Sequence, residues 1–233
     1  MNLIEPRSVV DVGCGLGTWL SVFREQGVDD VIGVDGEYVR TELLQIPSEN
    51  FLRYDLTRAL ILDRTFDLVV SLEVAEHLPS NSAEAFVESL TLLGPVILFS
   101  AAIPRQGGAN HVNEQWPEYW IQLFDSRGYA CLDPIRPHIW LKEDIEPWYI
   151  QNAFLYVERA YLESNQALKA VQPDDLSYPL SIVHRRLYLE LARSSDVKRI
   201  GIKASLRGLV WGIKTALENA GRNDTLQHLP PDR

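Results

Sequence analysis

Two carboxylates and an imidazole stand within five residues of the stretch SLEVAEHLP, as Glu73, Glu76 and His77. A second imidazole, His111, follows in the stretch GANHVNEQWPEYW. Such oxygen and nitrogen donors together suit Mg²⁺, Mn²⁺, Fe²⁺ or Zn²⁺, with water or a substrate oxygen in the remaining positions. An imidazole alone, with an ordinary pKa near ~6.5, can instead remove a hydroxyl proton at neutral pH. We therefore predict a metal site formed by Glu73, Glu76, His77 and His111, with Glu73, His77 and His111 as the catalytic candidates.

Apolar runs that alternate with helix-like segments must bring these groups together. The predicted strands are 8–12, 30–34, 50–54, 66–71 and 95–100, and the predicted helices are 17–26, 37–45, 82–93 and 117–127. This regular spacing is typical of βαβ units with a parallel sheet covered on both faces. Two later runs, YACLDPI and NAFLYVER, are predicted to close the sheet as an antiparallel pair.

The carboxyl ends of the strands are the expected ligand-binding edge of such a sheet. Both the Glu73–His77 stretch and His111 follow predicted strands, so we expect them to meet at this edge. If the SLEVAEHL segment is helical, positions 73, 76 and 77 share one face of the helix.

Three glycines, Gly13, Gly15 and Gly17, lie between the first predicted strand and the first predicted helix. Glycine lets the backbone turn tightly and approach a ligand at a helix N-terminus. A dinucleotide fingerprint needs a glycine at position 18, where Thr18 stands. The pattern therefore disfavours a dehydrogenase, and we do not expect NAD to bind. A tight turn without a ligand is the alternative.

Four motifs, in order, resemble the class I S-adenosylmethionine (SAM)-dependent methyltransferases over about residues 5–158. VVDVGCGLG is similar to the family's methionine-binding loop, and FDLVVSLEVAEHL to its fourth motif. In VIGVDG the resemblance implies that Asp35 holds the ribose hydroxyls. In FLRYDLT it implies that Asp55 accepts from the adenine amino group and Leu56 packs on the ring. The implied cofactor-binding residues are Asp11, Gly13, Cys14, Gly15, Gly17, Asp35, Gly36, Asp55, Leu56 and Leu72.

The resemblance implies an α/β, Rossmann-like fold with strand order 3-2-1-4-5-7-6 and the last strand antiparallel. Most relatives have a helix before the first strand, whereas about seven residues precede it here. We expect either that the chain begins short or that another part of it, such as the C-terminal segment, covers the cofactor in place of that helix.

The predicted metal set is similar in outline to that of the small-RNA 3′-terminal ribose methyltransferases and to the E-x-x-E-H segment of the ubiquinone-pathway O-methyltransferases. The same EVxEHL pattern occurs in relatives without a metal, where the acid hydrogen-bonds near the cofactor's methionine and the histidine braces a loop. The aromatic side chains of Trp116, Tyr119 and Trp120 are predicted to stack on a substrate ring or sugar, with core packing as the alternative.

The composition limits the class of protein and the partners that we expect. The chain has 233 residues, 46% of them hydrophobic, and a net charge of −10. Residues 1–197 hold 15 Lys and Arg against 29 Asp and Glu, so DNA is not an expected partner. Cys14 and Cys131 lie far apart, and the sequence shows neither a signal peptide nor a membrane span. A cytoplasmic location is predicted.

The predicted domains are a methyltransferase domain at 1–158 and a helical extension at 159–233. The extension contains two predicted helices, at 157–171 and 180–194, and then a basic amphipathic helix at 205–221. This last helix is predicted to contact a membrane surface or a protein partner, or else to pack on the body or across a homodimer.

The sequence therefore predicts an enzyme that methylates a hydroxyl of a small molecule or glycan with SAM. One alternative is a metal-dependent RNA ribose 2′-O-methyltransferase, which would need a basic groove. The other is a non-catalytic SAM-binding interaction module.

Overall fold

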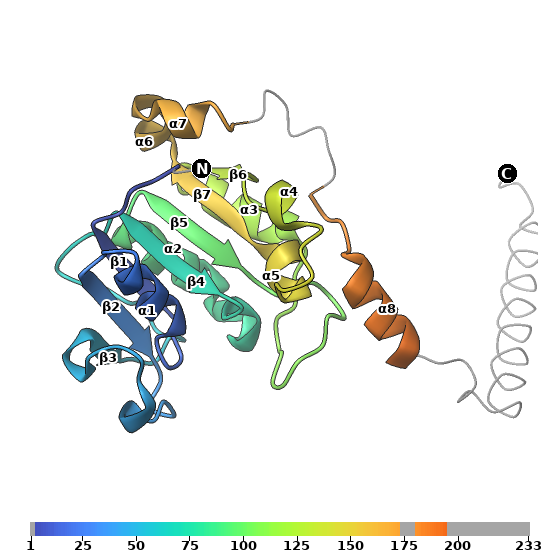
Figure 1. The fold of residues 1–233 in the computed structure, drawn as a ribbon, viewed down its shortest axis with the longest axis horizontal. Coiled ribbons are helices and arrows are strands. Elements are labelled where there is room, and N and C mark those ends of the chain that lie inside the picture. The colour runs from blue at the N-terminus through green and yellow to red at the C-terminus, as the bar shows by residue number, and fades with distance from the viewer. Residues whose placement is uncertain (1–2, 173–179, 195–233) are drawn as a thin grey trace, which may run out of the picture. The chain divides into compact units, whose positions relative to one another are not determined.

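The computed structural model describes residues 3–172 and 180–194. Residues Met1–Tyr188 form one compact unit, and Leu189–Arg233 form a second, of which only 189–194 are described. The first unit contains the whole sheet drawn in Figure 1.

Seven strands form this sheet, in the order β3-β2-β1-β4-β5-β7-β6. The strands are β1 (Ser8–Val12), β2 (Asp30–Asp35), β3 (Phe51–Arg53), β4 (Leu68–Leu72), β5 (Val96–Ser100), β6 (Tyr129–Leu132) and β7 (Phe154–Glu158). β1 to β5 pair in parallel, and β7 is antiparallel to both β5 and β6. The predicted fold class and strand order are confirmed.

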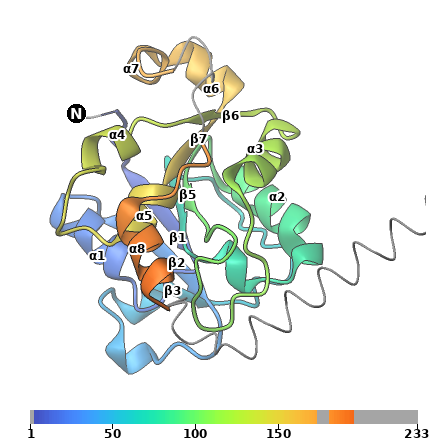
Figure 2. The same cartoon turned by 90° about the vertical axis from the view of Figure 1, so that its right-hand side faces the viewer.

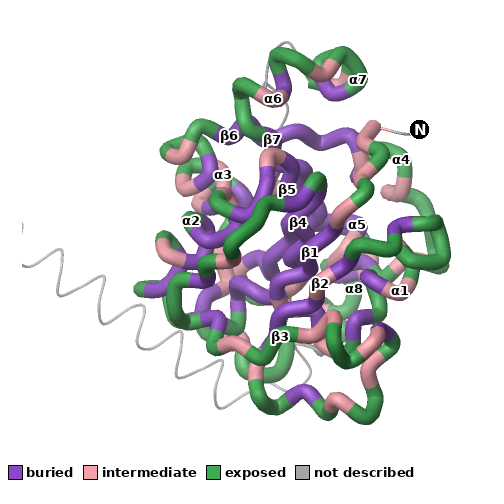
Figure 3. The backbone as a smooth tube through the Cα atoms, turned by 90° about the vertical axis from the view of Figure 1, so that its left-hand side faces the viewer, coloured by how far each residue is buried: buried purple, intermediate pink, exposed green. Residues whose placement is uncertain are grey.

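The central strands are buried on both faces, which explains why their sequences are continuous apolar runs. Val9 and Val10 of β1 are both fully buried, yet they pack into different core clusters. Successive side chains of a strand point to opposite faces, so the sheet divides the core in two. Figure 3 shows the buried backbone concentrated in these strands.

Helices cover both faces of the sheet. They are α1 (Thr18–Glu25), α2 (Ala83–Leu93), α3 (Pro117–Asp125), α4 (Arg136–Ile139), α5 (Pro147–Asn152), α6 (Arg159–Ser164), α7 (Gln166–Lys169) and α8 (Arg185–Ser194). Short 3₁₀ turns are η1 (Thr41–Leu43), η2 (Ser48–Asn50), η3 (Ala75–His77) and η4 (Ser80–Ser82). α2 and α3 lie on one face and α1 and α5 on the other, as the edge-on view shows (Figure 2).

Two predicted helices differ from the structure. The segment 37–45 holds only the η1 turn, because the Tyr38 hydroxyl bonds to Asp35 and Gln45 N–H donates to Leu16 C=O. The predicted helix 157–171 is divided into β7, α6 and α7. The Asn165 side chain accepts a hydrogen bond from the N–H of Leu168 at 3.1 Å and so forms the N-cap of α7.

The segment after residue 179 is bonded into the same unit. Leu180 C=O accepts a hydrogen bond from Nη1 of the buried Arg136, and His184 N–H donates to Gln151 Oε1 at 2.7 Å. The domain boundary at 158 stays a prediction. The predicted amphipathic helix at 205–221 lies outside the described residues, and among those described no helix has both the length and the apolarity that a membrane span needs.

Candidate functional site

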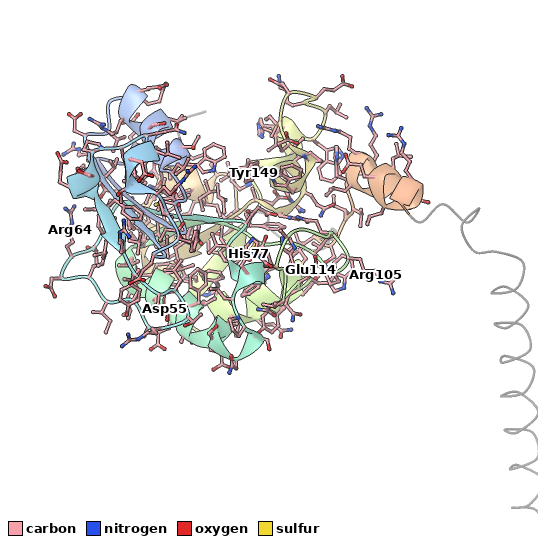
Figure 4. The ribbon with its side chains drawn as sticks, turned by 90° about the horizontal axis from the view of Figure 1, so that it is seen from below. Asp55, Arg64, His77, Arg105, Glu114 and Tyr149 are labelled. Atoms are coloured by element: carbon pink, nitrogen blue, oxygen red, sulfur yellow. The ribbon has the colours of Figure 1, made fainter. Side chains whose placement is uncertain are left out.

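A cavity of about 590 Å³ opens at the carboxyl ends of β1, β2 and β4. Its volume is typical of a site for a small ligand. Eight residues predicted to act at the site line it: Gly13, Gly15, Asp35, Gly36, Asp55, Leu56, Glu73 and His77. Asp55 and His77 mark its two sides in Figure 4. The topology thus brings four separate motifs to one edge of the sheet, as the sequence predicts.

Gly13 shows why the loop after β1 needs glycine. Its φ is +90°, and a Cβ there would lie 2.3 Å from Cγ2 of Val74. Gly15, at φ +54°, has open space where a Cβ would stand. Gly17, which begins α1 without lining the cavity, would bring a Cβ to 2.9 Å from Ile46. The loop therefore presents bare backbone to the cavity and packs closely behind it.

Asp35 ends β2 as a buried carboxylate that bonds to the glycine loop. Its Oδ2 accepts the N–H of Gly15 and its Oδ1 the N–H of Gly36, both at 2.6 Å. The Tyr38 hydroxyl also donates to Oδ1. Asp35 therefore ties two cavity walls together, and the Tyr38 hydroxyl occupies one of its carboxylate oxygens.

Four residues predicted to bind the cofactor do not line the cavity: Gly17, described above, and Cys14, Leu72 and Asp11. Cys14 is buried against Gly33, and Leu72 packs at the margin of the core. Asp11 is 2% exposed, and its Oδ2 has no hydrogen-bond partner among the described residues. Burial, followed by the negative charge of Asp35, raises the pKa of Asp11 to about 8. The sequence cannot separate these supporting positions from lining ones, because one motif contains both.

Glu73 follows β4 with a φ of +56°, which is unusual for a residue with a side chain. Its backbone N–H donates to Ser100, and its two carboxylate oxygens accept from Gln106 Nε2 at 2.9 Å and Asn152 Nδ2 at 3.1 Å. Only Ala75–His77 form a helical turn, so the predicted shared helix face of positions 73, 76 and 77 is wrong. Glu73 lines the cavity as an anchored carboxylate.

Glu76, His77 and His111 form a cluster in which one donor atom of each lies within 4.8 Å of the others. Glu76 is fully buried, and both carboxylate oxygens lack a hydrogen-bond partner among the described residues. Burial first, and the charge of Glu73 second, raise the pKa of Glu76 to about 8. Burial also lowers the pKa of His77, helped by the neighbouring imidazole of His111. The arrangement thus holds one buried acid beside two imidazoles.

The segment after β5 is held against η3 by main-chain bonds. The N–H groups of Val112 and Asn113 both donate to the C=O of Glu76, at 2.8 and 3.0 Å. The rings of His77 and His111 meet edge to face, with centroids 4.8 Å apart. Two segments 34 positions apart in the chain are therefore joined where the cluster forms.

The three predicted substrate aromatics have different positions. Trp120 is 2% exposed and packs on Phe99 in the core, so the core-packing alternative describes it and the substrate prediction is wrong for this residue. Tyr119 is half-buried against Trp120. Trp116 is 42% exposed, so its ring is accessible to a ligand.

Several site residues were not predicted from the sequence. They are the cavity-lining Tyr38, Thr57, Val74, Leu78 and Asn110, the amides Gln106 and Asn152 that hold Glu73, and Glu114 beside His111. Of these, only Glu114 carried a usable signal, a carboxylate three positions after a candidate histidine.

Comparisons with known proteins bear on the family and the fold of the chain. A family model described as a methyltransferase domain matches residues 2–136. The chain is 23% identical over 172 residues to the mitochondrial ubiquinone biosynthesis O-methyltransferase of Dictyostelium discoideum, over 64% of this chain and 50% of that protein. The chain thus spans about half the length of this curated relative. Magnesium protoporphyrin IX methyltransferase from Synechocystis PCC 6803, solved with bound SAM, has a TM-score of 0.50 and 21% identity, over 67% of this chain and 72% of that one.

The fold and the cavity define an α/β protein with a candidate ligand site at the carboxyl edge of its sheet. The family model covers more than half of the chain, and the chain belongs to this methyltransferase family. The chain carries the methyltransferase domain of this family.

Replacement of Asp35 by alanine is expected to weaken SAM binding by roughly 1–3 kcal/mol, the cost of leaving polar partners unpaired. Calorimetric titration with SAM measures this. Tyr38→Phe is the matched control, because it removes only the hydroxyl that occupies Oδ1 in this structure. SAM should bind that variant at least as tightly as it binds the parent, and unchanged affinity in Asp35→Ala would refute the role of Asp35.

The stability of the ligand-free protein is expected to fall as the pH rises from about 4 to about 8. Asp11 has a folded-state pKa of about 8 against an ordinary value of 3.8, so unfolding releases its proton within this range. The group alone lowers the free energy of unfolding by up to about 1.4 kcal/mol per pH unit. Urea unfolding at pH 5 and at pH 8 measures the change. The free energy of unfolding should fall less between these two pH values in Asp11→Asn than in the parent. Equal losses would contradict the buried, protonated state of Asp11.

Proposed function

We propose that this enzyme methylates a hydroxyl oxygen of a small molecule or glycan, with Glu76, His77 and His111 holding a divalent cation at the acceptor. The observation that carries the proposal is the fully buried Glu76 carboxyl, which makes no hydrogen bond of ordinary geometry among the described residues and has a donor atom of His77 and of His111 within 4.8 Å. Such a group is costly unless it is protonated or faces a cation. Two imidazoles stand where ligands of that cation would be needed.

The donor set fits a divalent ion. Two imidazole nitrogens and one carboxylate favour Zn²⁺, Mn²⁺ or Fe²⁺ over Mg²⁺, which prefers oxygen ligands. Donors at about 2.1 Å from one ion lie at most about 4.2 Å apart, so binding would draw the widest pair of the 4.8 Å cluster closer. A bound ion there would lower the pKa of a coordinated hydroxyl and orient its oxygen.

The protein's own residues account for the rest of the reaction. The glycine loop and Asp35 would hold the cofactor, and His77, which lines the same cavity, would lie on the acceptor side. Methyl transfer is an in-line displacement, in which the acceptor oxygen forms a bond to the methyl carbon as the carbon–sulfur bond breaks. The hydroxyl proton passes to solvent water, and a cation held by the cluster would favour this loss by lowering the pKa of the hydroxyl.

Two further observations support a small acceptor with a hydroxyl group. Residues 1–197 are strongly acidic, which disfavours a polyanionic acceptor such as RNA. The curated relative is named as an O-methyltransferase of ubiquinone biosynthesis, a small-molecule pathway.

The test is to incubate the full chain with methyl-labelled SAM and a cell extract of the host, and then to separate small molecules, glycans and RNA. Label on an oxygen atom of a small molecule or glycan is the expected result, and Gly13→Ala protein should produce none. Label confined to RNA, or to nitrogen or carbon atoms, would overturn the proposal.

A further inference from the structure

The Glu114 carboxylate accepts three hydrogen bonds around the segment that carries His111. Its Oε2 accepts the N–H of Arg105 at 2.6 Å, and its Oε1 accepts the N–H of Gly107 at 2.9 Å. The same Oε1 lies 3.0 Å from Nδ1 of His111. Figure 4 shows Glu114 next to His77, with Arg105 farther out on the same side.

We propose that Glu114 is a positioning residue that holds His111 in the tautomer with its proton on Nδ1, leaving the lone pair on Nε2 for the Glu76–His77 cluster. The inference rests on the proposed function, because it assigns His111 to the reacting centre.

The tautomer follows from the chemistry of the partner. An ionised carboxylate can only accept hydrogen bonds, so the nitrogen that faces it must donate. Oε1 and Oε2 already accept two main-chain N–H groups, which holds the carboxylate in this orientation. A neutral imidazole carries one N–H, so the proton on Nδ1 leaves Nε2 as the acceptor or ligand atom. Carboxylate partners of this kind set the orientation and basicity of ligating histidines.

The ring of His111 is held on other sides as well. Gly108 lies against it, and a Cβ at that glycine would stand 2.2 Å from Nε2. The ring of His77 meets it edge to face at 4.8 Å. These neighbours restrict the rotation of the ring, so the choice between the two tautomers depends on the group at Nδ1.

A glutamine at position 114 separates this role from a purely structural one. Glu114→Ala would also release Arg105, whose φ of +69° needs support. Glu114→Gln keeps the size, but its amide must turn either oxygen or NH₂ toward His111. The oxygen preserves the Nδ1–H tautomer, and the NH₂ group forces the proton to Nε2. We therefore expect the variant to lose the single tautomer.

The experiment is nitrogen-15 NMR of the histidine rings in the full, metal-free chain at pH 8. Two other histidines serve as internal references. Nδ1 of His138 lies 2.9 Å from the C=O of Pro134, and Nε2 of His184 lies 3.0 Å from the C=O of Trp140. A carbonyl only accepts, so these rings report the Nδ1–H and Nε2–H tautomers respectively.

The parent His111 should show the pattern of His138, and Glu114→Gln should convert it to a mixture while both references stay unchanged. Zn²⁺ affinity, measured by calorimetry, should fall by roughly 10–100-fold in this variant. Glu88→Gln, at an exposed carboxylate on α2, is the charge-matched control and should change neither measurement. A parent His111 with the pattern of His184 would overturn the inference, and so would an unchanged Zn²⁺ affinity together with an unchanged tautomer pattern in Glu114→Gln.

This readout needs no acceptor. A failed search for a methylated hydroxyl, or full activity in His111→Ala, would refute the proposed function and leave the tautomer result to stand or fall by itself.

Discussion

Gly13→Ala is expected to lower the affinity for SAM by at least about 100-fold, which corresponds to ~3 kcal/mol. The added Cβ would lie 2.3 Å from Cγ2 and 2.7 Å from Cγ1 of Val74, so the loop or η3 must shift. The φ of +90° adds strain of order 1–3 kcal/mol for any residue with a side chain. Both effects act on a wall of the cavity, and calorimetric titration with SAM measures the result.

Two variants distinguish this steric cause from general unfolding. Gly15→Ala is the matched control, because its Cβ would meet nothing within 4 Å, so we expect a smaller loss. The double variant Gly13→Ala with Val74→Ala removes both methyl groups that the new Cβ would meet, and should recover part of the affinity. Circular dichroism follows the fold in each protein. No recovery in a folded double variant would show that Val74 is not the obstacle.

Alanine substitution of Glu76, His77 or His111 is expected to lower kcat by roughly 10²–10⁴-fold, because each loss would weaken the hold on the cation that assists removal of the acceptor proton. If the three share one ion, each single loss should resemble the combined loss, because groups that act as a unit are not additive. Chelation with EDTA should abolish the labelling of acceptors from SAM, and one divalent ion should restore it.

Glu73 provides the contrast within the same segment. Its oxygens are already satisfied by Gln106 and Asn152, and it is not among the three clustered donors. Glu73→Gln should therefore leave the affinity for Zn²⁺ within a few-fold of the parent. If EDTA has no effect and only His111→Ala is inactive, His111 is a lone base and the metal proposal is wrong. If Glu73→Gln lowers the affinity for Zn²⁺ as much as substitution of a cluster residue does, Glu73 is also a ligand of the ion.

The sequence alone was sufficient for the sheet and for most of the cavity. Its central strands are apolar runs long enough to be buried on both faces, and such runs have few alternative structures. The glycines follow β1, Asp35 is the last residue of β2 and Asp55 comes two residues after β3, so a parallel topology brings them to one edge. Asp35 and Asp55 could therefore be placed at the cavity from local patterns and the family resemblance.

Only the tertiary structure decided which ionisable groups meet. Glu73 and Glu76 are three positions apart, yet a positive φ at Glu73 turns it toward Asn152, far along the chain. The sequence shows that residue 120 is aromatic but not whether its ring faces a ligand or the core. In the structure Trp120 packs on Phe99 in the core. The roles of Gln106, Asn152 and Glu114 depend on hydrogen bonds between loops. Loop conformation is set by such long-range contacts rather than by local periodicity, and this is why the sequence predicted the edge of the sheet but not the partners at it.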